Sequence, residues 1–77
     1  MIKKYTIKNA FANEYLAEAD ETDKIFLKER NYAFHVCQAL HEIAIFDTKE
    51  EAMNAYAESF SNPLNEVGII VEVLLKE

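Results

Sequence analysis

Glycine, proline, cysteine and tryptophan are all scarce in this 77-residue sequence, which has one glycine, one proline, one cysteine and no tryptophan. The single cysteine, Cys37, excludes an intrachain disulfide, and a lone free thiol is typical of a reducing cytosol. The single glycine, Gly68, excludes phosphate-binding loops and dinucleotide-binding fingerprints, because both motifs need several glycines. These absences argue against a disulfide-stabilised domain and against the common nucleotide-dependent enzymes.

Long apolar runs are also missing, although 51% of the residues are hydrophobic. No stretch approaches the roughly 20 apolar residues that span a bilayer. The amino terminus has lysines but lacks the apolar run of a signal peptide. The high hydrophobic content is unlike that of a disordered chain. We therefore expect a cytoplasmic protein with no membrane contact, folded as a single domain over residues 1–77.

The shortness of the chain limits its core. A domain of this size buries only roughly 60% of the surface that its unfolded form exposes. Its core alone rarely supplies more than about 3–5 kcal/mol of stability. Because no disulfide is available, a partner chain is the simplest source of further burial, and the sequence predicts a homodimer.

Basic residues are few. The chain has 8 Lys and Arg against 14 Asp and Glu, for a net charge of −6, which argues against direct nucleic-acid binding because phosphate contacts need a basic patch. Five acids fall within ten residues that contain no Lys or Arg: Glu14, Glu18, Asp20, Glu21 and Asp23. This acidic stretch is either a solvated hairpin edge or a patch that binds a basic protein surface.

The first half of the chain contains short strand patterns. Residues 2–8 alternate between apolar and polar side chains, which predicts a strand with one solvated face. Residues 14–19 suit a second strand, joined to the first by a hairpin loop over 9–13 in which asparagine substitutes for glycine. Residues 24–28 suit a short third strand.

Two helices are predicted in the middle of the chain. Apolar residues at helical spacing favour a helix over 32–41, followed by an extended segment over 43–46. A second helix extends to about Phe60. Thr48 and Glu51 have the spacing of a capping box at its start, and Asp47 with Glu50 offers the same box one residue earlier.

The last predicted element is a strand over 67–75 that is apolar on both faces, which is typical of a central or covered strand. Its odd-numbered residues form one apolar face. Ile70 and Leu74 flank Glu72 on the other face, and we expect these three residues to form the oligomer interface. Gly68 indicates a bulge or a close backbone approach. The expected fold is therefore α+β, with one small antiparallel sheet that carries two helices on one face.

No catalytic residues, metal site or cofactor are predicted. Cys37 and His41 would share a helical face, but His35 would point away, and two ligands cannot form a structural zinc site. A cysteine nucleophile would need an adjacent base and an oxyanion hole, whereas Cys37 lies on the apolar side of the predicted helix. We therefore expect a protein that is not an enzyme.

Four segments together resemble a class of small phage and prophage proteins: Tyr5-Thr6-Ile7-Lys8, Tyr15-Leu16, residues 44–52 and Val71-Glu72-Val73. The resemblance implies a small acidic protein that inhibits a host defence or nucleic-acid-handling protein by direct contact, in the manner of anti-CRISPR proteins.

An alternative function is the sequestration of a nucleotide or similar small ligand by an oligomer. In that case aromatic rings would stack on a base and basic groups would hold phosphate. The candidate residues are Tyr5, Phe11, Tyr32 and Phe34, with Lys4, Lys8 or Arg30. The competing interpretation is that most of these rings belong to the core.

Overall fold

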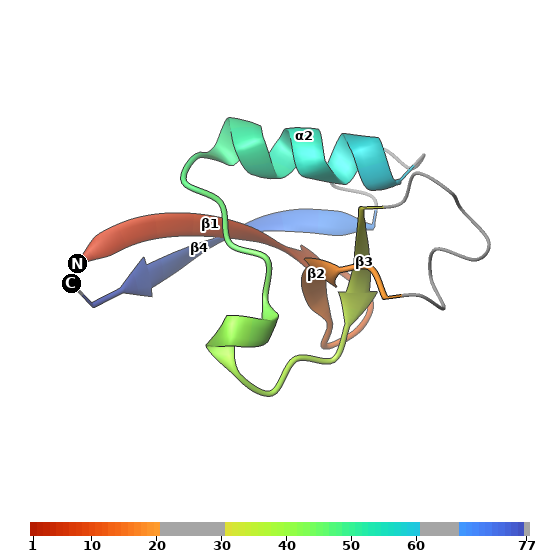
Figure 1. Ribbon diagram of the computed structural model, residues 1–77, viewed down its shortest axis with the longest axis horizontal. Helices are drawn as coiled ribbons and strands as arrows, with labels where there is room; N and C mark the ends of the chain where they lie inside the picture. The colour runs from red at the N-terminus through yellow and green to blue at the C-terminus, as the bar shows by residue number, and fades with distance from the viewer. Residues whose placement is uncertain (21–30, 61–66, 77) are drawn as a thin grey trace.

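The computed structural model describes residues 1–20, 31–60 and 67–76. Over these residues, four strands form one antiparallel sheet in the order β3-β2-β1-β4, and helix α2 packs on one face of it (Figure 1). The elements are β1 (Ile2–Asn9), β2 (Tyr15–Glu18), β3 (Tyr32–His35), the 3₁₀ turn η1 (Leu40–Glu42), α2 (Lys49–Ser59) and β4 (Gly68–Leu75). The α+β class and the single antiparallel sheet are confirmed. The strand expected over 24–28 lies outside the described residues.

Strand β1 is the centre of the sheet. It pairs with β4 along its whole length, from Ile2 opposite Leu75 to Asn9 opposite Gly68. On its other side it turns into β2 through the predicted hairpin. There the Asn9 amide donates to the Glu14 carbonyl at 2.9 Å, and the Asn9 side chain accepts from the backbone amide two residues on. Asparagine thus makes the turn that glycine makes elsewhere.

The connector between η1 and α2 runs beside β1, where β1 and β2 diverge. Its Ala44 amide donates to the carbonyl of Leu16 at 2.8 Å, and Phe46 exchanges two backbone hydrogen bonds with Tyr5. The hydroxyl of Thr6, which is fully buried, donates to the Ala44 carbonyl at 2.7 Å. The extended conformation expected for this segment is confirmed where it bridges β1, and the connector supplies partners that β2 does not.

The core lies between α2 and the sheet. Its buried cluster consists of Ile7, Leu16, Ala52, Ala55 and Tyr56. Phe60, at the end of the helix, stacks on Tyr56 with a centroid distance of 4.9 Å. A Cβ at Gly68 would lie 2.6 Å from the Tyr56 ring and 2.8 Å from Ile7. The expected close approach at Gly68 is therefore confirmed, and it brings β4 against the helix.

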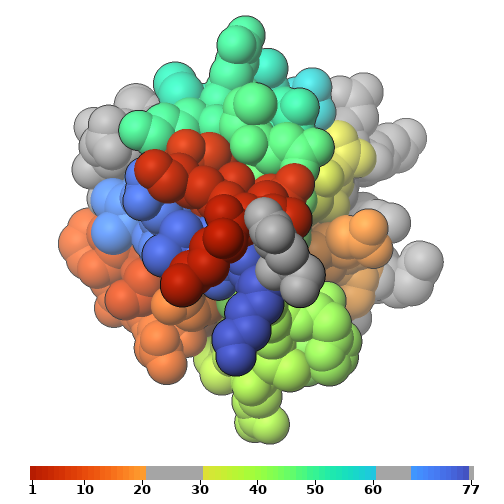
Figure 2. Space-filling model, turned by 90° about the vertical axis from the view of Figure 1, so that its left-hand side faces the viewer, coloured from red at the N-terminus to blue at the C-terminus, as the bar shows by residue number. Residues whose placement is uncertain are grey.

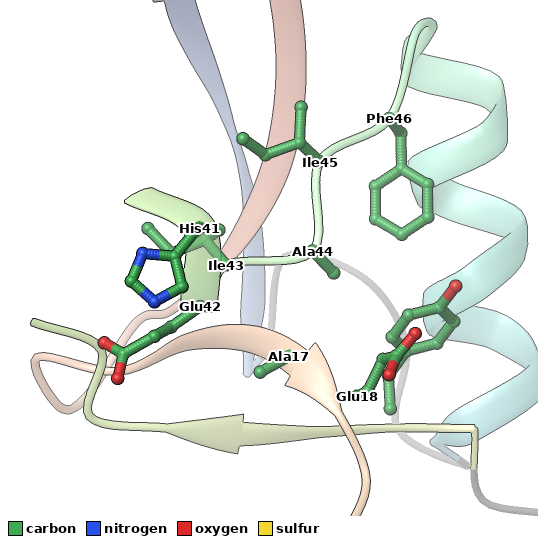
Figure 3. A pocket seen from close by; sticks show the side chains of 9 residues that line it. Ala17, Glu18, His41, Glu42, Ile43, Ala44, Ile45 and Phe46 are labelled. Carbon is green, nitrogen blue, oxygen red and sulfur yellow. The ribbon is translucent and has the colours of Figure 1, made fainter. Parts of the chain in front are cut away.

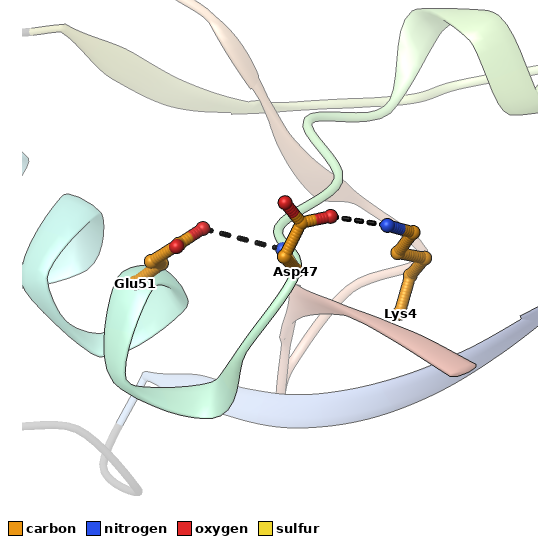
Figure 4. A network of polar contacts seen from close by, with 3 residues as sticks. All are labelled: Lys4, Asp47 and Glu51. Atoms are coloured by element: carbon orange, nitrogen blue, oxygen red, sulfur yellow. Dashed lines mark hydrogen bonds and ion pairs between the residues drawn. The ribbon is translucent and has the colours of Figure 1, made fainter. Parts of the chain in front are cut away.

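The start of α2 follows the predicted cap. Thr48 is the N-cap, and its hydroxyl accepts from the Glu51 amide at 3.1 Å. The Glu51 carboxylate accepts from the amide of Asp47 at 3.3 Å, so the returning bond of the capping box reaches one residue before the cap. The Asp47 carboxylate in turn pairs with Lys4 of β1 (Figure 4). This network fixes the helix start against the sheet.

The helix predicted over 32–41 is wrong. Residues 32–35 form β3, which pairs with β2 from Glu18 opposite Tyr32 to Tyr15 opposite His35, and only the short turn η1 follows. The physical reason is that tertiary contacts outweigh the local helical pattern. Strand β2 supplies backbone partners, while the Tyr32 and Phe34 rings pack against the core. Cys37 and His41 therefore share no helical face.

Of the two situations expected for the last strand, central or covered by another element, the central one is not found among the described strands. Among the described strands, β4 is an edge strand with β1 as its neighbour. Its even-numbered residues face α2, as the contacts at Gly68 show, and Ile70 packs against the core cluster. Of the expected oligomer interface, the side chains of Glu72 and Leu74 are exposed and that of Ile70 is not. The face that points away from α2 carries the odd-numbered apolar residues, Ile69, Val71, Val73 and Leu75.

Candidate protein-binding surface

A surface hollow lies where β2, β3, η1 and the connector meet (Figure 3). Its volume is about 450 Å³. We call it the acidic hollow, and its lining residues are Ala17, Glu18, Tyr32, His41, Glu42, Ile43, Ala44, Ile45 and Phe46. Figure 3 shows Glu18 and Glu42 on opposite sides of Ala17. The hollow therefore combines apolar walls with two separated carboxylates.

A second, smaller hollow adjoins the first and shares Glu18 and Tyr32 with it. This side hollow has a volume of about 350 Å³ and reaches Glu58 near the end of α2. None of the described residues that line either hollow is Lys or Arg. The fold thus places three carboxylates from β2, η1 and α2 around two adjoining hollows, and His41 is the one basic residue type in their described lining.

Glu42 is held as a carboxylate by backbone donors. One of its oxygens accepts from the amides of Gln38 at 2.6 Å and Ala39 at 2.9 Å. These hydrogen bonds from Ala39 and Gln38 lower the pKa of Glu42, and the charge of His41 adds to the effect. Hydrogen bonds to the charged form favour that form, so Glu42 contributes a fixed negative charge at neutral pH.

The acidic stretch expected from the sequence is not gathered into one described surface. Glu14 is half-buried and accepts from the Asn9 side-chain amide at 2.9 Å, inside the hairpin. Glu18 lines both hollows, and Asp20 is exposed. Glu21 and Asp23 lie outside the described residues. Glu18 is therefore the one member of the stretch that the described structure combines with other carboxylates.

Sequence reasoning missed Glu42 and Glu58 as companions of Glu18. They are 24 and 40 residues further along the chain, and each looks like an ordinary surface acid. Their proximity to the end of β2 depends on how η1 and the last turn of α2 meet the sheet. No local sequence pattern predicts how these elements pack against the sheet.

The described neighbours of Cys37 do not activate its thiol. Its thiol donates to the carbonyl of His35 at 3.5 Å. Burial raises the pKa of the Cys37 thiol, and the negative charge of Glu42 raises it further. Because the thiolate is the reactive form, this thiol is a weak nucleophile at neutral pH. In residues 1–20, 31–60 and 67–76, no group of three or more His, Cys, Asp or Glu side chains could hold a metal ion.

The aromatic residues proposed for ligand stacking mostly have packing roles. Tyr5, Tyr32 and Phe34 lie against the core cluster, and the Tyr32 ring makes an edge contact with Phe46 at a centroid distance of 5.6 Å. Phe11 is 81% exposed at the hairpin. These positions support the interpretation of most rings as core residues. Arg30 lies outside the described residues.

Within the described ranges no helix is long and apolar enough to cross a membrane. Comparison of the chain with protein-family models, with curated proteins and with solved structures found no match.

Proposed function

We propose that this chain is a small, non-enzymatic binding protein whose partner is a protein with a basic surface. The observation that supports the proposal is the placement of Glu18, Glu42 and Glu58 around two adjoining hollows, with no Lys or Arg among the described lining residues. Paired carboxylates alone would be ordinary surface charge. Here they border concave, partly apolar surface, which is the shape that a protruding side chain needs.

The acidic hollow suits a lysine or arginine side chain of the partner. Such side chains lay their aliphatic stems along apolar surface and keep the charged head near water or an anion. Ala17, Ala44 and Phe46 supply the apolar wall, and Glu18 and Glu42 supply acceptors at either side. A charge-assisted hydrogen bond to a carboxylate is roughly twice as strong as a neutral one. The net charge of −6 would also speed the encounter with a basic surface.

The resemblance to small phage and prophage proteins indicates what kind of partner the proposal implies. In that setting the partner is a host defence or nucleic-acid-handling protein, and occupation of its basic surface inhibits it. Proteins that handle nucleic acids carry basic grooves because phosphate contacts need them. A small acidic protein would then compete for the same groove.

The test compares two variants that change net charge equally. Glu18→Gln removes the carboxylate that both hollows share. Glu50→Gln removes one exposed carboxylate elsewhere, on α2. Tagged wild type and both variants would capture partners from a bacterial lysate. Binding of the captured protein would then be measured between about 0.05 and 0.3 M salt, a range over which screening shortens to under about 10 Å.

The proposal expects the hollow variant to bind more weakly and with less salt dependence, mainly through a slower association rate. The control variant should stay close to wild type. Equal losses in both variants would reduce the effect to overall charge and would contradict a role for the hollows. An unchanged hollow variant would contradict the proposal itself.

A further inference from the structure

The outer edge of β4 presents backbone groups without partners among the described residues. Tyr5 directs its amide and carbonyl toward Phe46, away from β4. In an antiparallel ladder these directions alternate along each strand. Glu72, which lies opposite Tyr5, therefore directs its amide and carbonyl away from β1, toward the open edge. By the same alternation Ile70 and Leu74 do so too.

Within residues 1–20, 31–60 and 67–76, this edge lacks the usual protection against pairing. Natural edge strands are short, carry several charges or proline, or are covered by another element. β4 has eight residues, no proline and a single charged residue, Glu72. Leu74 is 59% exposed on one face of the strand, and the apolar odd-numbered residues lie on the other. A second strand could therefore pair with this edge and cover apolar surface on both faces.

We propose that the strand that pairs with this edge belongs to a second copy of the chain. The two β4 strands would run antiparallel about a two-fold axis at Leu74. In this register Glu72 of each copy lies opposite Lys76 of the other, so that each pairing places opposite charges side by side. A register centred on Glu72 would instead place two carboxylates opposite each other, which is destabilising. Charge complementarity within β4 and its following residue thus favours a second copy in this register, in which Glu72, whose carboxylate lies 3.7 Å from the Lys3 ammonium of its own chain, also meets Lys76 of the other copy.

The position of α2 leaves room for this pairing. The helix contacts β4 near Gly68, at the start of the strand. The other end of β4 extends with β1 beyond the helix (Figure 1), and the two terminal segments lie side by side in front of the molecule with α2 above them (Figure 2). The paired strands would join two four-stranded sheets into one continuous sheet, with the same surface used by both copies, as a two-fold interface requires.

The test is a charge-reversal cycle read by the mass of the full chain in solution. Light scattering after gel filtration, from about 10 µM to about 1 mM, covers the range of modest affinities. Wild type should approach twice the 8.9 kDa of one chain. Glu72→Lys and Lys76→Glu should each weaken dimerisation about tenfold, because like charges then face each other at two symmetric sites. The double variant Glu72→Lys/Lys76→Glu should recover most of it, because only the exposed ion pair between Glu72 and Lys3 of the same chain stays lost.

A backbone variant tests the edge directly. Leu74→Pro removes one outward amide while leaving the β1 ladder intact, since proline is tolerated on the open side of an edge strand. It should be monomeric with an unchanged circular dichroism spectrum, whereas Leu74→Ala should dimerise better than Leu74→Pro. A wild type that is monomeric at all concentrations would overturn the proposal, and a strand of another protein would then be the candidate partner of this edge. A Leu74→Pro variant that dimerises like wild type, or a double variant that fails to recover, would overturn the interface or its register.

Discussion

Replacement of Gly68 by alanine tests the packing of β4 against the helix. The added Cβ would lie 2.6 and 3.1 Å from two carbons of the Tyr56 ring and 2.8 Å from the Ile7 methyl. Ordinary carbon contacts are about 3.5–4.0 Å. Neither neighbour can move aside cheaply, because Tyr56 is 2% exposed and Ile7 is fully buried. Gly68 does not have a left-handed backbone, so the expected cost is steric.

The magnitude follows from two opposing effects. Overpacking of a core costs about 1–3 kcal/mol, whereas replacing glycine with alanine restricts the unfolded chain and returns about 0.4–1 kcal/mol. We expect Gly68→Ala to lower the free energy of unfolding by about 1–2 kcal/mol, a large part of the roughly 3–5 kcal/mol available to a core this small. With a urea m-value near 1 kcal/mol/M, the midpoint would fall by roughly 1–2 M.

The assay is urea unfolding followed by circular dichroism at fixed protein concentration. Its control is a double-mutant cycle with Tyr56→Leu, which removes the ring edge that the new methyl would strike. The cost of Gly68→Ala should shrink in that background, since residues in contact are not additive. A Gly68→Ala variant as stable as wild type would refute the steric reasoning. If Gly68→Ala costs as much stability in the Tyr56→Leu background, the added methyl clashes with Ile7 and not with the ring.

Three further predictions concern the helix cap and the turn near η1. Thr48→Ala should lower the free energy of unfolding by about 0.5–2 kcal/mol in urea melts, because the Glu51 amide loses its acceptor; Asp47→Ala should cost less. Cys37 should react with a thiol reagent at higher pH than free cysteine does, as a pH–rate profile would show, because its pKa is raised. Glu42 has a lowered pKa, so its carboxylate stabilises the fold above the pKa of the unfolded chain and ceases to do so as pH falls through the folded value. Any stability advantage of wild type over Glu42→Gln should therefore vanish in acid denaturation curves.

The elements that sequence alone predicted are those with strong local signals. Alternation over residues 2–8 located β1, and the two overlapping capping boxes at Asp47 and Thr48 located the start of α2 to within one residue. These signals need no knowledge of the rest of the chain, because strand periodicity and helix capping are set within a few residues.

The incorrect predictions concern segments whose structure depends on tertiary contacts. Ala33, Val36 and Cys37 have helical spacing, yet only Ala33 is buried, and it is in a strand. Partner strand β2 and the aromatic contacts of β3 outweighed a weak helical preference, which is a common outcome for short segments. The two hollows were missed for the same reason, because Glu42 and Glu58 approach Glu18 only after η1 and α2 have packed on the sheet.

The pairing of β1 with β4 has a consequence for how the protein is made. Of the described strands, the first along the chain lies beside the last, with Ile2 opposite Leu75. While β4 is still inside the ribosome, the emerging chain can form the hairpin and α2, but one side of β1 has no neighbour. Contacts this distant in sequence close a loop of nearly the whole chain and slow folding. The sheet can therefore be completed only after β4 has left the ribosome, and removal of Gly68–Leu75 should leave a chain that never reaches the native fold.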